Sequence, residues 1–253
     1  MIRIVAYAGS RNPRSTTLQA IHRTRKALDR TMSASWTVIT PNDLTILPSD
    51  GTASEFLTGV DRVEESGRDD SALLKRLFEE CDYLILGTPT YGRNVSGDMK
   101  ILMDRITYWS HLFRLANKPG MVFVSATTNG FLEVGALMER FMESLGMVVD
   151  ETAYHTSLSP FDDMKAESAA ENIRTTMERL RFDPVLTPSE SQEQTFRLYR
   201  RMYRSRNGDD YESRYWISHG MCDCDSLHEY FGRVAGRSSV ANSDDMPNQE
   251  EAS

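Results

Sequence analysis

The residues with the clearest chemical potential lie in the stretch GTPTYGRNVSGDMKILMDR, residues 87–105. Tyr91 offers a planar ring with a polar tip. Backbone and side-chain donors surround it in Thr90, Gly92 and Asn94. A flat heteroaromatic ligand needs both features, because its face stacks on rings and its edge takes hydrogen bonds. The stretch follows an apolar run, residues 83–86, which is typical of a buried strand. It predicts a ligand site at the carboxyl end of that strand.

A second candidate site follows the amino-terminal apolar run, where a hydroxyl-rich loop precedes a helix. Its candidate ligands are Ser10, Arg11, Ser15, Thr16 and Thr17. Ser15 is a natural N-cap, and the N–H groups and dipole at a helix start favour an anion such as phosphate. An ordinary capped turn fits the same residues. The loop has neither a P-loop Gly-Lys-Ser/Thr nor G-x-G-x-x-G, which disfavours ATP and a tightly held dinucleotide.

A third loop, Thr127-Thr128-Asn129-Gly130, follows another apolar run, residues 121–126. Its small hydroxyl, amide and glycine residues match the character of the first two loops. Because the carboxyl ends of parallel strands meet at one edge of a sheet, we expect all three loops to share one ligand.

The elements that must position these loops alternate along the first 182 residues. Short apolar runs predict strands at residues 2–7, 36–40, 83–86, 121–126 and from 147 onward. Stripes at helical spacing follow all five, for example Met99, Leu102, Met103, Ile106 and Trp109. Five β-α units predict an α/β doubly wound parallel sheet. Residues 41–70 form a long polar connection with a short helix near 55–60. In the helix that begins near residue 97, we expect Lys100, Asp104 and Arg105 to make pairs on the helix surface.

A composition change at residues 184–188 predicts a boundary. We assign residues 1–183 to the ligand-binding domain and 184–237 to a C-terminal extension with a helix around 196–204 and an irregular part from 211 to 237. The extension is too small to fold alone, so we expect it to mediate oligomerisation or to cover the active site. Residues 238–253 are polar and acidic, and we expect a disordered tail.

The extension contains a cluster with metal-ligating residue types, His219, Cys222, Cys224 and His228. The ligand types suit zinc, but Cys-x-Cys holds two sulfurs awkwardly and no second pair follows. A redox-active thiol pair and ordinary packing are the alternatives. We predict no metal site.

The bulk composition narrows the function classes. A net charge of −8 disfavours a wide nucleic-acid or anionic-membrane surface. No run approaches the length of a membrane span, and the N-terminus enters a strand without a signal-peptide pattern. Three cysteines fit a reducing compartment, so we expect a cytoplasmic protein.

The motifs together resemble the NAD(P)H-dependent FMN reductase family of the flavodoxin-like fold, which is related to iron–sulfur flavoproteins and to quinone and azo reductases. The most specific segment is Pro89-x-Tyr91-x-x-x-Val95-Ser96-Gly97-x-Met99-Lys100 with Asp104-Arg105 behind it, and the resemblance covers about residues 1–182. It implies a five-stranded parallel sheet in the order 2-1-3-4-5, with helices on both faces.

The resemblance also implies where FMN would bind. The phosphate would lie on Ser10, Ser15, Thr16 and Thr17. The isoalloxazine would lie against Pro89, Thr90, Tyr91, Gly92 and Val95, with Arg93 and Asn94 in the same loop. Residues 127–130 would close the other side. The chain departs from the family pattern at Asn12, where Arg is common, and at Gly92, where an aromatic is common. The cysteine cluster of the iron–sulfur relatives is missing.

These observations predict an enzyme, an FMN-dependent oxidoreductase that takes hydride from NAD(P)H and passes electrons to a flavin, quinone or other small organic acceptor. The chemistry would be centred on the flavin, with no catalytic side chain. A biosynthetic flavoenzyme with a specific substrate and a flavodoxin-like electron carrier are the alternatives. We expect a homodimer or homotetramer.

Overall fold

The computed structural model describes the backbone of residues 1–244 and the side chains of residues 1–237. Its centre is a parallel sheet of five strands in the order β2-β1-β3-β4-β5, which confirms the predicted topology. The strands are β1 (Ile2–Ala8), β2 (Ala34–Ile39), β3 (Tyr83–Pro89), β4 (Pro119–Ser125) and β5 (Val148–His155). No helix in the described part of the chain is long and apolar enough to cross a membrane.

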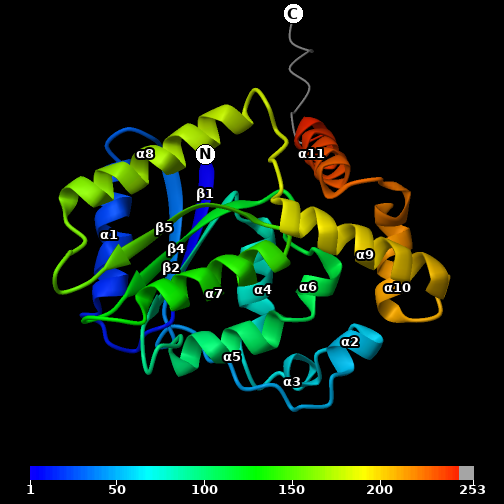
Figure 1. Ribbon diagram of the computed structural model, residues 1–253, viewed down its shortest axis with the longest axis horizontal. Helices are drawn as coiled ribbons and strands as arrows, with labels where there is room; N and C mark the ends of the chain where they lie inside the picture. The colour runs from blue at the N-terminus through cyan, green and yellow to red at the C-terminus, as the bar shows by residue number, and fades with distance from the viewer. Residues whose placement is uncertain (245–253) are drawn as a thin grey trace, which may run out of the picture.

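Helices cover both faces of the sheet, as Figure 1 shows. One face packs against α1 (Thr16–Leu28) and α8 (Asp163–Leu180). The other packs against α4 (Ser71–Glu80), α5 (Gly97–Ile106) and α7 (Phe131–Ser144). The strand sequence explains this arrangement, because alternate side chains point to opposite faces. In β1, Ile4 and Ala6 join the first core and Val5 and Tyr7 join the second.

Two predicted elements differ in their extent. The apolar stripe from Met99 to Trp109 is not one helix, because α5 ends at Ile106 and a separate turn of helix, α6 (Trp109–Leu112), follows. The polar connection contains α2 (Ser54–Thr58), close to the predicted short helix, and also α3 (Arg62–Glu65).

The C-terminal extension is helical throughout most of its length, so the expectation of an irregular segment at 211–237 was wrong. It comprises α9 (Glu190–Arg206), α10 (Tyr211–Ser218), the 3₁₀ turn η1 (Met221–Asp223) and α11 (Leu227–Asp244). Aromatic side chains build a third core here, because Trp216 packs against Phe196 and Tyr203. The helix α11 continues into the segment where we expected disorder, and residues 245–253 lie outside the described part of the chain.

The extension lies at the end of the sheet opposite to the three loops (Figure 1), so it does not cover the loops of its own chain. It is fixed to the amino ends of the strands. The Trp216 indole donates to the His111 carbonyl at 2.8 Å, and the Gln192 amide donates to the carbonyls of Glu143 and Met147 at 2.8 Å. An oligomerisation role for it stays a prediction.

Arg105 is buried rather than on the helix surface, which corrects the prediction. Its side chain is 0% exposed, and its guanidinium uses all five N–H donors. The acceptors are Asp61, Asp69, Ser71 and the Leu47 carbonyl. The spacing of charged residues along the helix did not predict this burial, because the partners lie mainly in the long connection, far away in sequence. Lys100 and Asp104 do pair on the surface of α5, as predicted.

The acidic partners of Arg105 stay ionised. Burial opposes the charged form of Asp61, but hydrogen bonds from Lys75 and Arg105 outweigh it, so the pKa of Asp61 lies below its ordinary value. For Asp69, burial is likewise outweighed by the hydrogen bond from Arg105, and its pKa is lowered. Lys75 completes the network with bonds of 2.7 Å to Asp61 and 2.6 Å to Glu64. The network clamps the connection 41–70 onto α5.

We expect Arg105→Met to lower the free energy of unfolding by about 3–5 kcal/mol, because two buried carboxylates lose the hydrogen bonds of the guanidinium and Asp69 loses its ionic partner. Urea unfolding at neutral pH measures the loss. Lys100→Met is the control: it breaks an exposed ion pair of the same helix and should cost less than about 1 kcal/mol.

The effect of Arg105→Met should also depend on pH. Because the folded-state pKa values of Asp61 and Asp69 are lowered, their contribution is present above the unfolded value of about 3.9 and is lost as the pH falls through the folded values. The difference between variant and wild type should therefore shrink in acid. A loss at neutral pH no larger than that of Lys100→Met would contradict the assignment.

Candidate functional site

Ser96 joins the loop after β1 to the loop after β3. Its side chain is buried and its hydroxyl donates to the Gly9 carbonyl at 2.5 Å. The same oxygen accepts from the Met99 N–H at 3.2 Å and so caps α5. The Ser96 N–H donates to the Thr88 hydroxyl at 3.0 Å. One residue therefore fixes the start of α5 and holds two loops together.

The close approach of the two loops requires a glycine at position 9. A Cβ there would lie 2.8 Å from the Cβ of Met99 and 2.9 Å from the Ser96 hydroxyl. The Gly9 N–H also donates to the Gly87 carbonyl at 2.8 Å, which continues the ladder between the strands. Any side chain at position 9 would push α5 away from β1.

The first loop presents a helix start with free donors. The Ser15 hydroxyl caps α1 by accepting from the Leu18 N–H at 3.1 Å. Within the described residues, the N–H groups of Thr16 and Thr17 have no protein partner. Two unpaired N–H groups at the first turn of a 13-residue helix suit an anion.

Two predicted phosphate ligands are already engaged by protein groups. The Thr17 hydroxyl is buried and bonds the Ser125 hydroxyl at 2.7 Å, so only its N–H is available. Arg11 bonds Asp98 through Nη2 at 2.8 Å and Nε at 3.2 Å. Hydrogen bonding to Asp98 raises the pKa of Arg11. Of the other candidates, Ser10 is buried and Thr16 is exposed.

The second loop forms a tight turn that displays an aromatic ring. Tyr91 and Asn94 exchange two backbone hydrogen bonds, of 2.9 and 3.0 Å. Gly92 and Arg93 both have positive φ, 57° and 61°, which defines a type I′ turn. The turn leaves Tyr91 62% exposed. The departure from the family pattern at Gly92 thus has a structural reason, since this turn needs a glycine or a residue that tolerates positive φ.

Thr90 precedes this turn and contributes an unsatisfied hydroxyl. Its N–H donates to the Ser125 carbonyl at 2.7 Å, but its Oγ1 is buried without a partner among the described residues. A buried polar atom without a partner is costly, which marks this position for a hydrogen bond to a bound group. Pro89 and Val95 are buried beside it, so they support the loop from within.

The third loop contacts the second through Gly130. This residue has a φ of 79°, and a Cβ on it would lie 2.9 Å from the Cα of Arg93. The Nη1 atom of Arg93 also lies 3.6 Å from Oε1 of Glu133 in α7, and both side chains are exposed. The preceding residues, Thr127, Thr128 and Asn129, are exposed. The structure therefore brings the third loop against the second.

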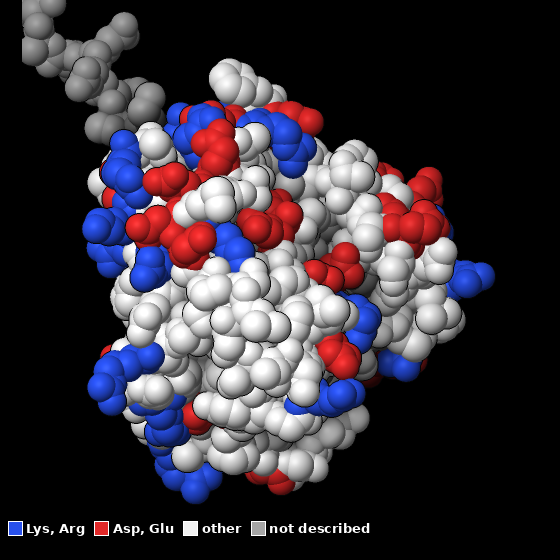
Figure 2. Space-filling model, turned by 60° about the vertical axis from the view of Figure 1, so that its left-hand side comes forward, with Lys and Arg blue, Asp and Glu red and all other residues white. Residues whose placement is uncertain are grey.

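A cavity of 380 Å³ lies between the first two loops. Its lining residues are Gly9, Ser10, Arg11, Asn12, Tyr91, Ser96, Gly97, Asp98 and Ile101. Figure 2 turns this end of the molecule toward the viewer: a broad area without charged residues occupies its middle, and Lys, Arg, Asp and Glu gather around it. Free N–H groups, an unsatisfied hydroxyl and an exposed ring fit a flat ligand that carries a phosphate.

The sequence-based list omitted Ser96, Asp98 and Ser125, which organise the loops. Ser96 had a recognisable signal, since a serine before a glycine and an apolar helical stripe is a typical N-cap. Asp98 and Ser125 had none, because their partners Arg11 and Thr17 lie 87 and 108 residues away.

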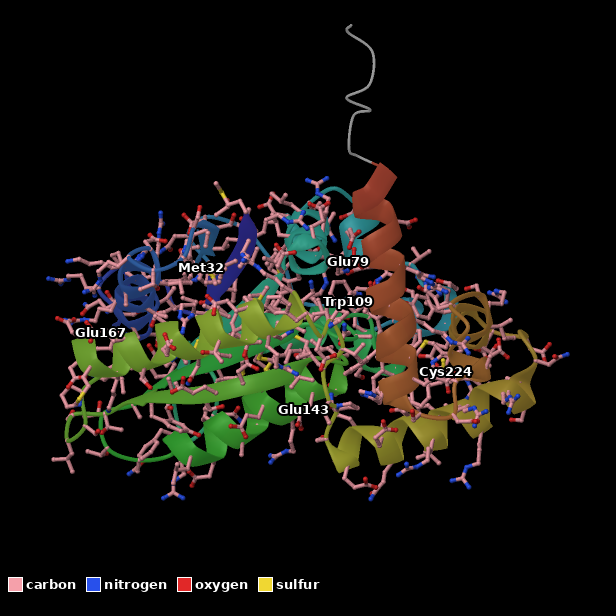
Figure 3. The ribbon with its side chains drawn as sticks, turned by 90° about the horizontal axis from the view of Figure 1, so that it is seen from above. Met32, Glu79, Trp109, Glu143, Glu167 and Cys224 are labelled. Atoms are coloured by element: carbon pink, nitrogen blue, oxygen red, sulfur yellow. The ribbon has the colours of Figure 1, made fainter. Side chains whose placement is uncertain are left out.

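Cys222 and Cys224 are free and buried in the core of the extension, where Figure 3 labels Cys224. Burial raises the pKa of Cys224 to about 11 and also raises the pKa of Cys222, which disfavours the reactive thiolate. The described residues contain no group of three or more His, Cys, Asp or Glu side chains placed to hold a metal ion.

Comparisons with known proteins agree on one family. The model of the family described as NADPH-dependent FMN reductase matches residues 2–157. An iron–sulfur flavoprotein of Archaeoglobus fulgidus is 39% identical over 82 residues, which cover 32% of this chain and 37% of that protein. One of Methanocaldococcus jannaschii is 31% identical over 109 residues, covering 37% of this chain and 56% of that protein. The matches thus span about a third to a half of these relatives.

Solved structures share the fold at low identity. An apo NADH:FMN oxidoreductase (EMOB) has a TM-score of 0.52 at 18% identity, and the match covers 76% of this chain and 94% of that protein's chain. RosB with bound 8-demethyl-8-formylriboflavin-5'-phosphate has a TM-score of 0.54 at 14% identity and covers 100% of this chain and 91% of its own. The alignment with RosB therefore includes the C-terminal extension.

Gly130→Ala tests the contact between the second and third loops. We expect it to destabilise the protein more than Gly51→Ala, because both residues have positive φ but only Gly130 has a neighbour that a Cβ would meet. The difference should be about 1–3 kcal/mol, the usual cost of overpacking. Urea unfolding of both variants measures it. Equal losses would mean that the loops separate freely.

Proposed function

The chain belongs to the NADPH-dependent FMN reductase family, and from this premise we propose that it takes hydride from NAD(P)H and passes electrons to a small organic acceptor such as a flavin or quinone. FMN is the cofactor of this family of oxidoreductases. When bound, FMN supplies the hydride and electron chemistry, and the protein supplies its orientation and electrostatic surroundings.

The observation that carries this proposal is the set of free donors on the first two loops, the same loops that line the 380 Å³ cavity. The free N–H groups of Thr16 and Thr17 and the dipole of α1 would hold the phosphate. The exposed ring of Tyr91 and the unpartnered hydroxyl of Thr90 would hold the flat ring system. Arg11 would act indirectly, since its guanidinium is committed to Asp98.

The backbone of the second and third loops supports the electrostatic part of the proposal. The N–H groups of residues 90–93 and 128–130 are the candidates for donors to the edge of the flavin ring. Those of Thr90 and Tyr91 already donate to the carbonyls of Ser125 and Asn94, which leaves Gly92, Arg93 and residues 128–130. The contact between Gly130 and Arg93 keeps these two segments together. Positive partial charge at that edge favours the electron-rich form of a bound ring.

The lack of a second nucleotide fingerprint supports a transient visit by NAD(P)H, followed by the acceptor at the same ring face.

We also propose a homodimer or homotetramer. Large apolar side chains are exposed around the loops, namely Tyr91, Leu132 and Leu158. A second copy of the chain could cover them.

The position of the extension bears on the alternative of a biosynthetic enzyme with one specific substrate. In that alternative, the extension would help to form the substrate pocket. Because the extension lies at the opposite end of the sheet (Figure 1), it does not shape the pocket of its own chain. We therefore favour the general reductase.

Rapid mixing of the FMN-loaded protein with NADPH or NADH in the absence of oxygen tests the donor. We expect the long-wavelength flavin absorption to bleach with at least one of them, and a quinone added afterwards should restore it. Dithionite is the control, because it reduces bound FMN without a nucleotide site. Bleaching with dithionite but with neither nucleotide would overturn the reductase proposal.

Thr16→Pro tests the phosphate site. Proline fits the first position of a helix, and the extended backbone of Ser15 accepts a following proline, so the change removes one N–H donor while α1 is kept. Relative to Thr16→Ala, which removes only the hydroxyl, FMN should bind about tenfold to a hundredfold more weakly, because a hydrogen bond to a charged group contributes about 1.5–3 kcal/mol.

Quenching of flavin fluorescence measures both affinities. Riboflavin lacks the phosphate and is the matched ligand, so its affinity should be equal in the two variants. Equal FMN affinity in Thr16→Pro and Thr16→Ala would place the phosphate elsewhere.

A further inference from the structure

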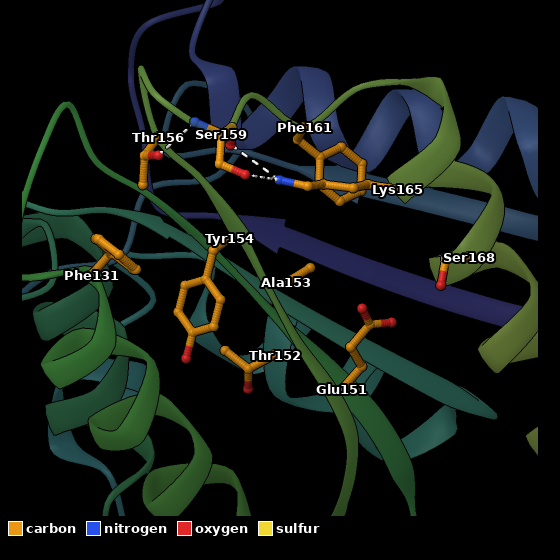
Figure 4. A pocket seen from close by; sticks show the side chains of 10 residues that line it. All are labelled: Phe131, Glu151, Thr152, Ala153, Tyr154, Thr156, Ser159, Phe161, Lys165 and Ser168. Carbon is orange, nitrogen blue, oxygen red and sulfur yellow. Dashed lines mark hydrogen bonds between the residues drawn. The ribbon is translucent and has the colours of Figure 1, made fainter.

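A second cavity, of 390 Å³, lies along β5, the outer strand of the sheet (Figure 4). We call it the β5 cavity. Its lining residues are Phe131, Glu151, Thr152, Ala153, Tyr154, Thr156, Ser159, Phe161, Lys165 and Ser168. Its volume falls in the usual range for small organic ligands. No residue of this set was among the candidates from the sequence, and none lines the cavity between the first two loops.

Aromatic rings form the apolar part of the β5 cavity. Phe131 and Tyr154 meet edge to face, with ring centroids 5.4 Å apart. Phe161 lies on the other side of β5 and packs edge to face on Phe123 at 5.2 Å. The rings of Phe131 and Tyr154 are only partly buried, so they keep surface for a ligand. A flat aromatic molecule matches such a lining.

Lys165 supplies a cation that has no acidic partner. Its ammonium donates to the Ser159 hydroxyl at 2.7 Å and to the Ser159 carbonyl at 3.1 Å. No carboxylate of the described residues lies within ion-pair distance of it, whereas neighbouring Arg23 is paired with Asp163 at 2.6 Å. An ammonium has three donors, so Lys165 can still bind an anion.

The other polar groups of the β5 cavity include an unpartnered hydroxyl and one carboxylate. The Thr152 hydroxyl is buried without a partner among the described residues and can bond a ligand atom. Glu151 is already engaged, because Asn172 donates to its carboxylate at 2.8 Å. At the end of β5, burial and the charges of Lys165 and Arg23 lower the pKa of His155.

The β5 cavity adjoins the third loop of the candidate flavin site. Phe131 directly follows Gly130, the residue that contacts Arg93. On the far side, the Ser157 N–H donates to the Thr127 carbonyl at 3.0 Å. A molecule in the cavity would therefore lie next to both ends of this loop.

We propose that the β5 cavity binds an aromatic anion, a molecule of the aryl carboxylate or aryl sulfonate class. The ring system packs against Phe131 and Tyr154, and the anionic group bonds Lys165. The site goes beyond the proposed function, because binding does not require that the molecule accept electrons.

Calorimetric titration of the full FMN-loaded chain with naphthalene-2-carboxylate and 2-naphthamide tests the proposal. The two probes share a ring system and differ in charge. Wild type should bind the carboxylate about tenfold more tightly, because only the carboxylate adds an opposite charge to the hydrogen bond from the Lys165 ammonium. Lys165→Met should remove this preference, because it weakens binding of the carboxylate more than binding of the amide. Phe131→Ala should weaken the binding of both probes.

Two variants separate binding from a structural role. Lys165→Arg keeps the charge and should keep the preference for the carboxylate. Lys26→Met removes an exposed lysine of α1 outside the cavity and should change neither affinity. The proposal is overturned if wild type binds neither probe, if it does not prefer the carboxylate, or if Lys165→Met binds both probes as wild type does. Bleaching of FMN by NAD(P)H is measured separately, so either proposal can fail alone.

Discussion

The approach of β1 to the start of α5 is the constraint on which the candidate site depends. Gly9 permits it, because any Cβ would meet Met99, and Ser96 fixes it through a hydroxyl that bonds the Gly9 carbonyl and caps the helix. The loops after β1 and β3 are thereby held at a fixed distance from each other. The cavity between them then follows, as does the exposure of Tyr91 across it. A binding surface made of two loops is normally mobile, but here a buried hydroxyl joins them.

The other end of α5 is held by the opposite kind of interaction. Ser96 makes short neutral hydrogen bonds at the start of the helix, whereas Arg105 makes buried ionic ones at its end. Buried charges are costly to desolvate, so this network is better understood as a specific clamp than as a large source of stability. It needs Asp61 and Asp69 in one geometry, which fixes the long connection 41–70. The loop that follows β3 therefore rests on a helix with two defined ends.

The sequence was sufficient for the features that depend on local pattern. Apolar runs and helical stripes located the five strands, and the hydroxyls around Ser15 indicated a capped helix. The order of the strands in the sheet came from the family resemblance. The sequence failed where a partner lies far away. Arg105 looked like a surface residue because its three acceptor side chains are 34–44 residues distant. Thr17 looked like a phosphate ligand, but its hydroxyl bonds Ser125. For α11 the sequence did carry a signal, because Leu227, Tyr230, Phe231 and Val234 recur at the helical spacing i, i+3, i+4 and i+7 and join one core.

The C-terminal extension and the candidate site lie at opposite ends of the sheet. The extension occupies the amino ends of the strands, so the carboxyl ends remain open and carry the uncharged surface of Figure 2. A molecule that reaches the candidate site must therefore be selected by the loops themselves or by a second copy of the chain. The type I′ turn at Gly92 and Arg93 makes the second loop narrow, and Gly130 presses the third loop against it. Because Phe131 directly follows Gly130 and lines the β5 cavity, the third loop adjoins both the second loop and that cavity.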